Sequence, residues 1–196
     1  MSCSWSPTRL GTTDLNVVPL GLASGYGARA RDVERAFDRG INLFYWGSVR
    51  RPDFGEGLRQ VGTRARERMV LVIQSYARWP SAVGRSLDEA LRELRLGHAD
   101  VLLLGWWNLP PRDAMLDAAA ELVARGRVRY VMVSCHHRPT FVKLARDKRI
   151  SLLMMRYNAA HPGAERDVFP HLPDPRPGVV ALDCRLGESI LSRLRR

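Results

Sequence analysis

The stretch Ser86-Leu-Asp-Glu-Ala-Leu-Arg-Glu-Leu-Arg-Leu96, followed by Ala99-Asp-Val-Leu-Leu-Leu-Gly-Trp-Trp107, decides the fold class. In the first segment, Leu87, Leu91 and Leu94 recur at the spacing of one helical face. The second segment is an apolar run that is too short to span a membrane and is typical of a strand covered on both faces. A helix that leads into such a strand is the repeating unit of a parallel α/β sheet.

The same alternation continues on both sides of this stretch. The apolar runs predict strands at 17–22, 41–45, 69–76, 99–107, 128–134, 150–157 and 178–182. The amphipathic runs predict helices at 30–39, 54–66, 81–96, 111–125, 140–147 and 164–172. About seven β/α units favour an incomplete (β/α)8 barrel of the TIM type, with the eighth unit missing, over an open sheet. We expect one C-terminally truncated barrel domain over residues 1–196, with an N-terminal hairpin at about 8–18.

Composition and charge narrow the class of protein. The chain has 196 residues and a formal charge of +11, and almost all of its basic residues are arginines scattered over every predicted helix. We interpret this charge as a compositional bias and do not expect a nucleic-acid interface. No signal peptide or membrane span is recognisable in the sequence. Three widely spaced cysteines form neither a disulfide framework nor a metal-binding pair, so we expect a cytoplasmic protein with no metal site.

Several segments resemble the aldo-keto reductase family, and they occur in the family's order from about residue 9 to residue 187. They correspond to the opening hairpin and first strand, the stretch before the catalytic aspartate, the third helix, and strands four, five and six. The segments are Leu10–Leu22, Arg39–Phe44, Ser86–Leu96, Ala99–Leu104, Gly126–Ser134 and Arg156–Asn158. One such segment would mean little, but the ordered set indicates the family's fold.

The resemblance implies NADP-dependent reduction of carbonyl compounds. In this family a tyrosine donates the proton, an aspartate and a lysine support it, and a histidine orients the substrate. A tyrosine, whose ordinary pKa is about 10, donates a proton poorly at neutral pH unless a cation lies beside it. The positions of the aspartate, tyrosine, lysine and histidine hold Tyr45, Phe54, Ser75 and Gly105, although an ungapped alignment would place Arg50 at the tyrosine. We therefore predict little or no family activity.

The positions that the resemblance assigns to the cofactor are altered as well. Ser134 matches the serine that holds the nicotinamide carboxamide, but Cys135 replaces the neighbouring asparagine. Met154 replaces a glutamine, and Leu182 replaces the aromatic residue that stacks on the nicotinamide. The family resemblance implies NADP, and these replacements predict that it binds weakly or not at all.

The carboxyl ends of the strands are the expected place for a site, as in other barrels of this type. The side chains expected to point inward there are Tyr45, Ser75, Gly105, Ser134, Arg156 and Leu182. The candidates for ligand binding are Trp46, Gln74, Tyr76, Trp106, Asn108, Ser134, Arg156 and Asn158. This aromatic and polar set predicts a small flat or anionic ligand. Tyr45 and His136 remain the candidates for a catalytic group.

Two interpretations stay open. The protein is either an oxidoreductase with altered residues, or a non-catalytic, ligand-binding or decayed relative of the family. A missing eighth unit would leave the strands at 17–22 and 178–182 as open edges, and open edges favour self-association. The alternative is that the N-terminal segment or a final helix at about 188–196 covers the gap.

Overall fold

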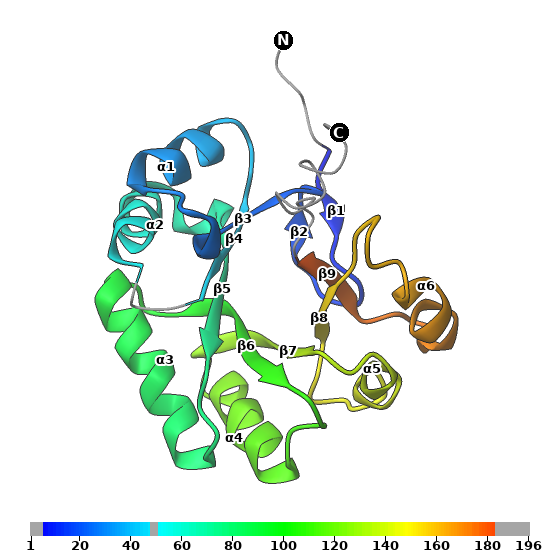
Figure 1. Ribbon diagram of the computed structural model, residues 1–196. Coiled ribbons are helices and arrows are strands. Elements are labelled where there is room, and N and C mark those ends of the chain that lie inside the picture. Colours follow the sequence, from blue (N-terminus) through cyan, green and yellow to red (C-terminus); the bar gives the residue numbers. More distant parts are fainter. Residues whose placement is uncertain (1–5, 48–50, 183–196) are drawn as a thin grey trace.

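The computed structural model describes residues 6–47 and 51–182, and its centre is a curled sheet of seven parallel strands (Figure 1). The strands follow one another in sequence order, so that each pairs with its predecessor. They are β3 (Gly21–Ala23), β4 (Leu43–Trp46), β5 (Val70–Ser75), β6 (Ala99–Trp107), β7 (Val128–Cys135), β8 (Leu152–Arg156) and β9 (Gly178–Leu182). This is a (β/α)8-type barrel with seven of its strands, as the sequence predicts.

The helices connect these strands and lie on the outer side of the sheet (Figure 1). They are α1 (Ala30–Asp38), α2 (Pro52–Ala65), α3 (Pro80–Leu94), α4 (Asp113–Ala124), α5 (Pro139–Leu144) and α6 (Ala164–Asp167). Three short 3₁₀ helices accompany them at η1 (Ser24–Tyr26), η2 (Arg66–Arg68) and η3 (Phe169–His171). No helix of the described segments is long and apolar enough to cross a membrane.

Strand alternation divides the apolar side chains into two clusters. Val72, Leu103 and Met132 belong to the inner cluster, which fills the concave side of the sheet. Leu71, Leu102 and the apolar faces of the helices form the larger outer cluster. Because successive residues of a strand point to opposite faces, cluster membership identifies which side chains near the strand ends can reach the barrel interior.

The expected first strand is in fact two elements with different partners. Asn16–Val17 is β2, which pairs antiparallel with β1 (Thr8–Arg9), whereas Gly21–Ala23 is the parallel strand β3. Pro19 separates them, and proline cannot donate a ladder hydrogen bond. Leu15 and Val17 of the hairpin are buried in the inner cluster, so the hairpin covers the amino end of the barrel.

Candidate functional site

The inner-face residues at the carboxyl ends of the strands form the candidate site. Strand register assigns them, because each pairs with a residue whose face is known. Gln74 pairs with Leu103 and Ser134 with Met154, and both partners belong to the inner cluster. Arg156 pairs with Leu182, which packs against the same cluster.

Ser75 does not face the site, and that expectation is wrong. It pairs with Leu104 of the outer cluster, and its Oγ lies 2.6 Å from Oγ of Ser86 in α3. The inward residue of β5 is Gln74. The alternation from Val70 and Val72, both in the inner cluster, to Gln74 already indicates this face in the sequence.

Trp46 and Phe54 also lie outside the site. Trp46 is 1% exposed in the outer cluster, and its Nε1 donates to the Arg51 carbonyl oxygen at 3.3 Å. Because Tyr45 faces inward, its neighbour in the strand must face outward. Phe54 lies on α2 and is buried in the same outer cluster, so it fills the helix layer and does not replace a group of the site. Arg50 lies outside the described residues.

Tyr45, Gln74 and Gly105 come together at the centre of the carboxyl end. The Tyr45 hydroxyl donates a hydrogen bond to Oε1 of Gln74. Gln74 is 7% exposed, and its Nε2 is a buried donor with no hydrogen-bond partner. A Cβ on Gly105 would lie 1.7 Å from that Nε2, so the amide fills the space that a side chain at position 105 would need.

A bulge in β6 places the indole of Trp106 at the rim. The register is regular up to Leu104 opposite Val133 and resumes with Trp107 opposite Cys135, which leaves one extra residue on β6. Trp106 lies in this bulge and has a φ of +65°. Such a left-handed conformation costs a non-glycine residue about 1–2 kcal/mol.

Hydrogen bonds hold this strained backbone in place. The Trp106 N–H donates to Oγ of Ser134 at 2.9 Å, and the Trp106 carbonyl accepts from Nη2 of Arg78 at 3.4 Å. The indole is 56% exposed and makes edge-to-face contacts with Tyr76 and His136, at centroid distances of 5.9 and 6.0 Å. The three rings form an aromatic rim at the carboxyl end of β5, β6 and β7.

The remaining candidates lie in loops. Asn108 is exposed after β6. Oδ1 of Asn158 accepts from the Ala160 N–H at 2.9 Å and lies 3.1 Å from Nδ1 of His161, so this residue shapes a local turn. Arg156 ends β8 on the inner face and brings a positive charge to this end of the barrel.

Cys135 is not suited to nucleophilic chemistry in this environment. It is buried in the outer cluster, and its burial raises the pKa of the thiol. Within residues 6–47 and 51–182, no three His, Cys, Asp or Glu side chains gather closely enough to hold a metal ion. The other two cysteines, Cys3 and Cys184, lie outside the described residues.

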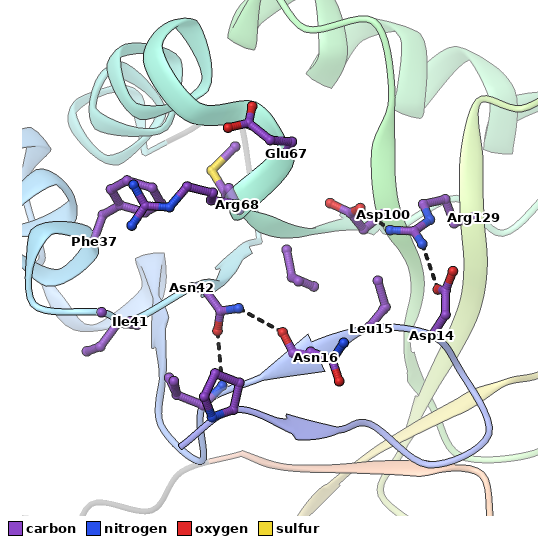
Figure 2. Close-up of a pocket in the computed structure, with 15 residues that line it drawn as sticks. Asp14, Leu15, Asn16, Phe37, Ile41, Asn42, Glu67, Arg68, Asp100 and Arg129 are labelled. Atoms are coloured by element: carbon purple, nitrogen blue, oxygen red, sulfur yellow. Dashed lines mark hydrogen bonds and ion pairs between the residues drawn. The ribbon is translucent and has the colours of Figure 1, made fainter. Parts of the chain in front are cut away.

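A cavity of about 410 Å³ lies at the opposite end of the barrel (Figure 2). It separates the N-terminal hairpin from the amino ends of β4 to β7. The amide of Asn42 ties its two walls together, because Oδ1 accepts from the Val18 N–H at 3.0 Å and Nδ2 donates to the Asn16 carbonyl at 2.8 Å. A second cavity, of about 690 Å³, lies between the hairpin turn and residues 172–176.

Charged groups at this amino end mostly satisfy one another. Asp100 is 3% exposed and accepts hydrogen bonds from the Leu71 N–H at 2.8 Å and from Arg129 at 3.2 Å. Arg66 pairs with the same carboxylate at 2.9 Å, and Arg129 also pairs with Asp14 at 2.6 Å. These contacts join the hairpin, β6 and β7, so they act as a structural clamp on the barrel floor.

Comparisons with known proteins relate this geometry to a family. No protein-family model and no curated protein sequence matches the chain. Solved structures do match. An aldo/keto reductase from Klebsiella pneumoniae, in complex with NADP and acetate, has a TM-score of 0.74 and 23% identity over 98% of this chain and 77% of its own. A putative aldo-keto reductase from Pseudomonas aeruginosa has a TM-score of 0.74 and 21% identity over 89% and 76%.

A third structure shows how much of the barrel is shared. The holo form of an aldo-keto reductase from Bacillus halodurans has a TM-score of 0.70 and 18% identity over 79% of this chain. The match spans only 58% of the length of that reductase. All of these structures are aldo-keto reductases, and at such low identities the likeness concerns the fold. The chain therefore resembles the aldo-keto reductases and has their barrel fold, in the form of seven parallel strands.

Proposed function

We propose that this protein binds a small planar ligand, carrying a negative charge or a carbonyl group, at the carboxyl end of its barrel, and that it does not reduce carbonyls by the aldo-keto reductase mechanism. The observation that supports this most directly is the pairing of Tyr45 with an amide. The Tyr45 hydroxyl donates to Oε1 of Gln74, a neutral amide on the neighbouring strand, where the family resemblance implies a charged lysine near the proton donor.

The distribution of lysine supports the loss of catalysis. The sequence contains only Lys143 and Lys148, one in α5 and the other in the connection to β8, and both are exposed. Neither lies on a strand, so neither takes the place of the lysine that supports the proton donor of the family. General acid catalysis typically contributes about 10²–10⁴-fold to a rate, and a reductase without it would be slow.

The residues present do not fit NADP. Met154 is 2% exposed inside the inner cluster and offers no amide to a carboxamide group. Leu182 packs against the same cluster and provides no aromatic ring on which a nicotinamide could stack. The Klebsiella pneumoniae reductase was solved with NADP, which makes this dinucleotide the first compound to test.

The aromatic rim of Tyr76, Trp106 and His136 supports the proposal that a ligand binds at this end of the barrel. Exposed aromatic side chains are enriched at ligand and partner sites because a flat ring can stack on them. Trp106 is held in a strained backbone conformation with its ring exposed, and strain of this kind concentrates at functional sites. Arg156 on the inner face of β8 favours an anionic group on the ligand.

Two measurements test the proposal. With NADPH and 4-nitrobenzaldehyde, we expect no absorbance change at 340 nm above the protein-free rate, and the same result for Tyr45→Phe. Benzoate should quench tryptophan fluorescence saturably in the wild type and in Trp79→Phe, an exposed tryptophan off the rim, but not in Trp106→Phe. Steady NADPH oxidation that Tyr45→Phe abolishes would instead identify Tyr45 as a proton donor and the protein as a reductase.

A further inference from the structure

Three side-chain donors in the described part of the chain are buried without a hydrogen-bond partner, and one of them, Nε2 of Gln74, lies on the inner face of the barrel. The carbonyl oxygen of the Gln74 amide is occupied by the Tyr45 hydroxyl, while its Nε2 is enclosed and has no partner. Buried side-chain donors without a partner are rare in folded proteins, and each calls for a physical reason. An apolar residue of similar size would fill the same space without leaving a donor unsatisfied.

Gly105 explains why the amide can occupy this place. Three atoms of the Gln74 side chain lie 1.7, 2.6 and 3.0 Å from where a Cβ of residue 105 would be. Gln74 therefore fits only because position 105 carries no side chain. In the structure, the donor end of the amide points toward Gly105 and the acceptor end toward Tyr45.

We propose that Gln74 is the specificity-determining residue of the site, and that its Nε2 donates a hydrogen bond to a carboxylate or carbonyl oxygen of the ligand. This inference rests on the proposed function and deepens it, because it names the chemical group that is recognised. The aromatic rim would hold the planar body of the ligand, and Gln74 would select its acceptor oxygen. A donor that is unsatisfied without a ligand discriminates strongly against molecules that lack an acceptor.

Binding requires a small movement, since the donor is enclosed in the unliganded chain. Trp106 follows Gly105 directly and is more than half exposed, so a shift of its ring is the movement that the proposal requires. The competing explanation is that a water molecule satisfies Nε2 and that Gln74 only supports the strand ends. The two explanations predict different ligand selectivity when the NH₂ donor of residue 74 is replaced by an acceptor of the same size.

Gln74→Glu is the decisive variant, because it keeps an acceptor for Tyr45 and replaces the NH₂ group with an oxygen of almost the same size. Calorimetric titration would compare benzoate, benzamide and benzylammonium as probes. We expect the wild type to bind benzoate and benzamide, and the variant to lose about 10- to 100-fold in benzoate affinity, as expected for a hydrogen bond to a charged group. The variant should instead gain affinity for benzylammonium.

Three further variants control for misfolding and position. Gly105→Ala places a methyl group where the amide lies and should weaken benzoate binding, whereas Gly97→Ala, which meets no atom within 4 Å, should not. Ser75→Ala changes the neighbouring residue on the outer face and should leave benzoate binding unchanged. In ¹H–¹⁵N spectra of the wild type, the side-chain NH₂ signals that are absent from Gln74→Glu should shift on addition of benzoate.

The outcomes separate the two proposals. If benzoate quenches Trp106 but binds Gln74→Glu within twofold of the wild type, the rim binds ligands and Gln74 does not select them, which overturns the inference alone. If none of the three probes binds the wild type at 10 mM, the proposed function itself fails. Loss of benzoate binding together with a gain of benzylammonium binding supports both.

Discussion

The two ends of the barrel differ in how far their polar groups are satisfied. At the amino end, the Asp100 carboxylate accepts from a backbone amide and two arginines, although Nε of Arg66 remains buried without a partner. At the carboxyl end, Nε2 of Gln74 and Nε1 of Trp107 are both buried donors without partners. Most charged groups described at the amino end thus pair with one another, whereas two buried donors at the carboxyl end have no partner within the described chain.

Backbone strain follows the same division. Two non-glycine residues in the described segments have a positive φ, Arg95 at +55° and Trp106 at +65°. Arg95 is the C-cap of α3, where a left-handed residue is a normal way to end a helix. Trp106 ends no helix and instead displays an aromatic ring at the rim. Barrels of this type generally separate a stabilising end from a functional end, and the contrast agrees with that rule.

The largest expected effect comes from breaking the amino-end clamp. Asp100→Ala would leave Arg66, whose side chain is 17% exposed, and the Leu71 N–H without their acceptor. Removing one partner of such a buried pair typically costs about 3–5 kcal/mol. Urea unfolding should show this as a lower midpoint with an unchanged slope.

An exposed ion pair provides the matched control for this prediction. Asp38 pairs with Arg64 at 2.8 Å, with side-chain exposures of 58% and 46%. Asp38→Ala should change the free energy of unfolding by no more than about 1 kcal/mol. If Asp100→Ala and Asp38→Ala lower the free energy of unfolding equally, the clamp does not stabilise the floor of the barrel.

The next effect is smaller and tests the strain at the rim. Trp106→Gly should raise the free energy of unfolding by about 1 kcal/mol, because glycine adopts a positive φ without cost, and it should abolish benzoate quenching. Arg95→Gly should give a similar gain in stability and leave benzoate binding unchanged. If Trp106→Gly instead lowers the free energy of unfolding, the packing of the indole contributes more to stability than the strained backbone costs. That result would contradict the prediction.

The fold was largely predictable from the sequence because its signals are periodic. The apolar runs at 99–107 and 178–182 match β6 and β9 residue for residue, and the other strands of the sheet differ mainly at their ends. The first strand was the exception, because Pro19 interrupts a run that reads as continuous. Hydrophobicity alone does not say which partner a short strand will pair with.

The site was harder to predict because it depends on shifts of one residue. The sequence predicts Ser75 inside and Gln74 beside it, whereas the register of β5 places Gln74 inside. The bulge in β6 could not be seen in the sequence, although it decides that Trp106 reaches the rim while Trp107 packs on the outer cluster. A family alignment at low identity fixes the order of strands more securely than the face of each residue.

The smallest expected effect is a pH dependence of stability set by the amino end. His98 lies beside the clamp, where its carbonyl accepts from Nη2 of Arg66 at 3.1 Å. Burial, and then the positive charge of Arg66, lower the pKa of His98 below its ordinary value of 6.5. The unfolded chain therefore binds a proton at a higher pH than the folded chain does.

This difference fixes the sign of the effect. Above pH 6.5 both states keep His98 neutral, and its environment costs nothing. As the pH falls below 6.5, the unfolded state gains the proton first, so stability decreases until the pH passes the folded-state pKa. His98→Gln should make stability depend less on pH in this range. Thermal melts at pH 7.5, 6.5 and 5.5 would measure it: the difference in Tm between wild type and variant should change across the series, and a constant difference would show that His98 does not couple the clamp to pH.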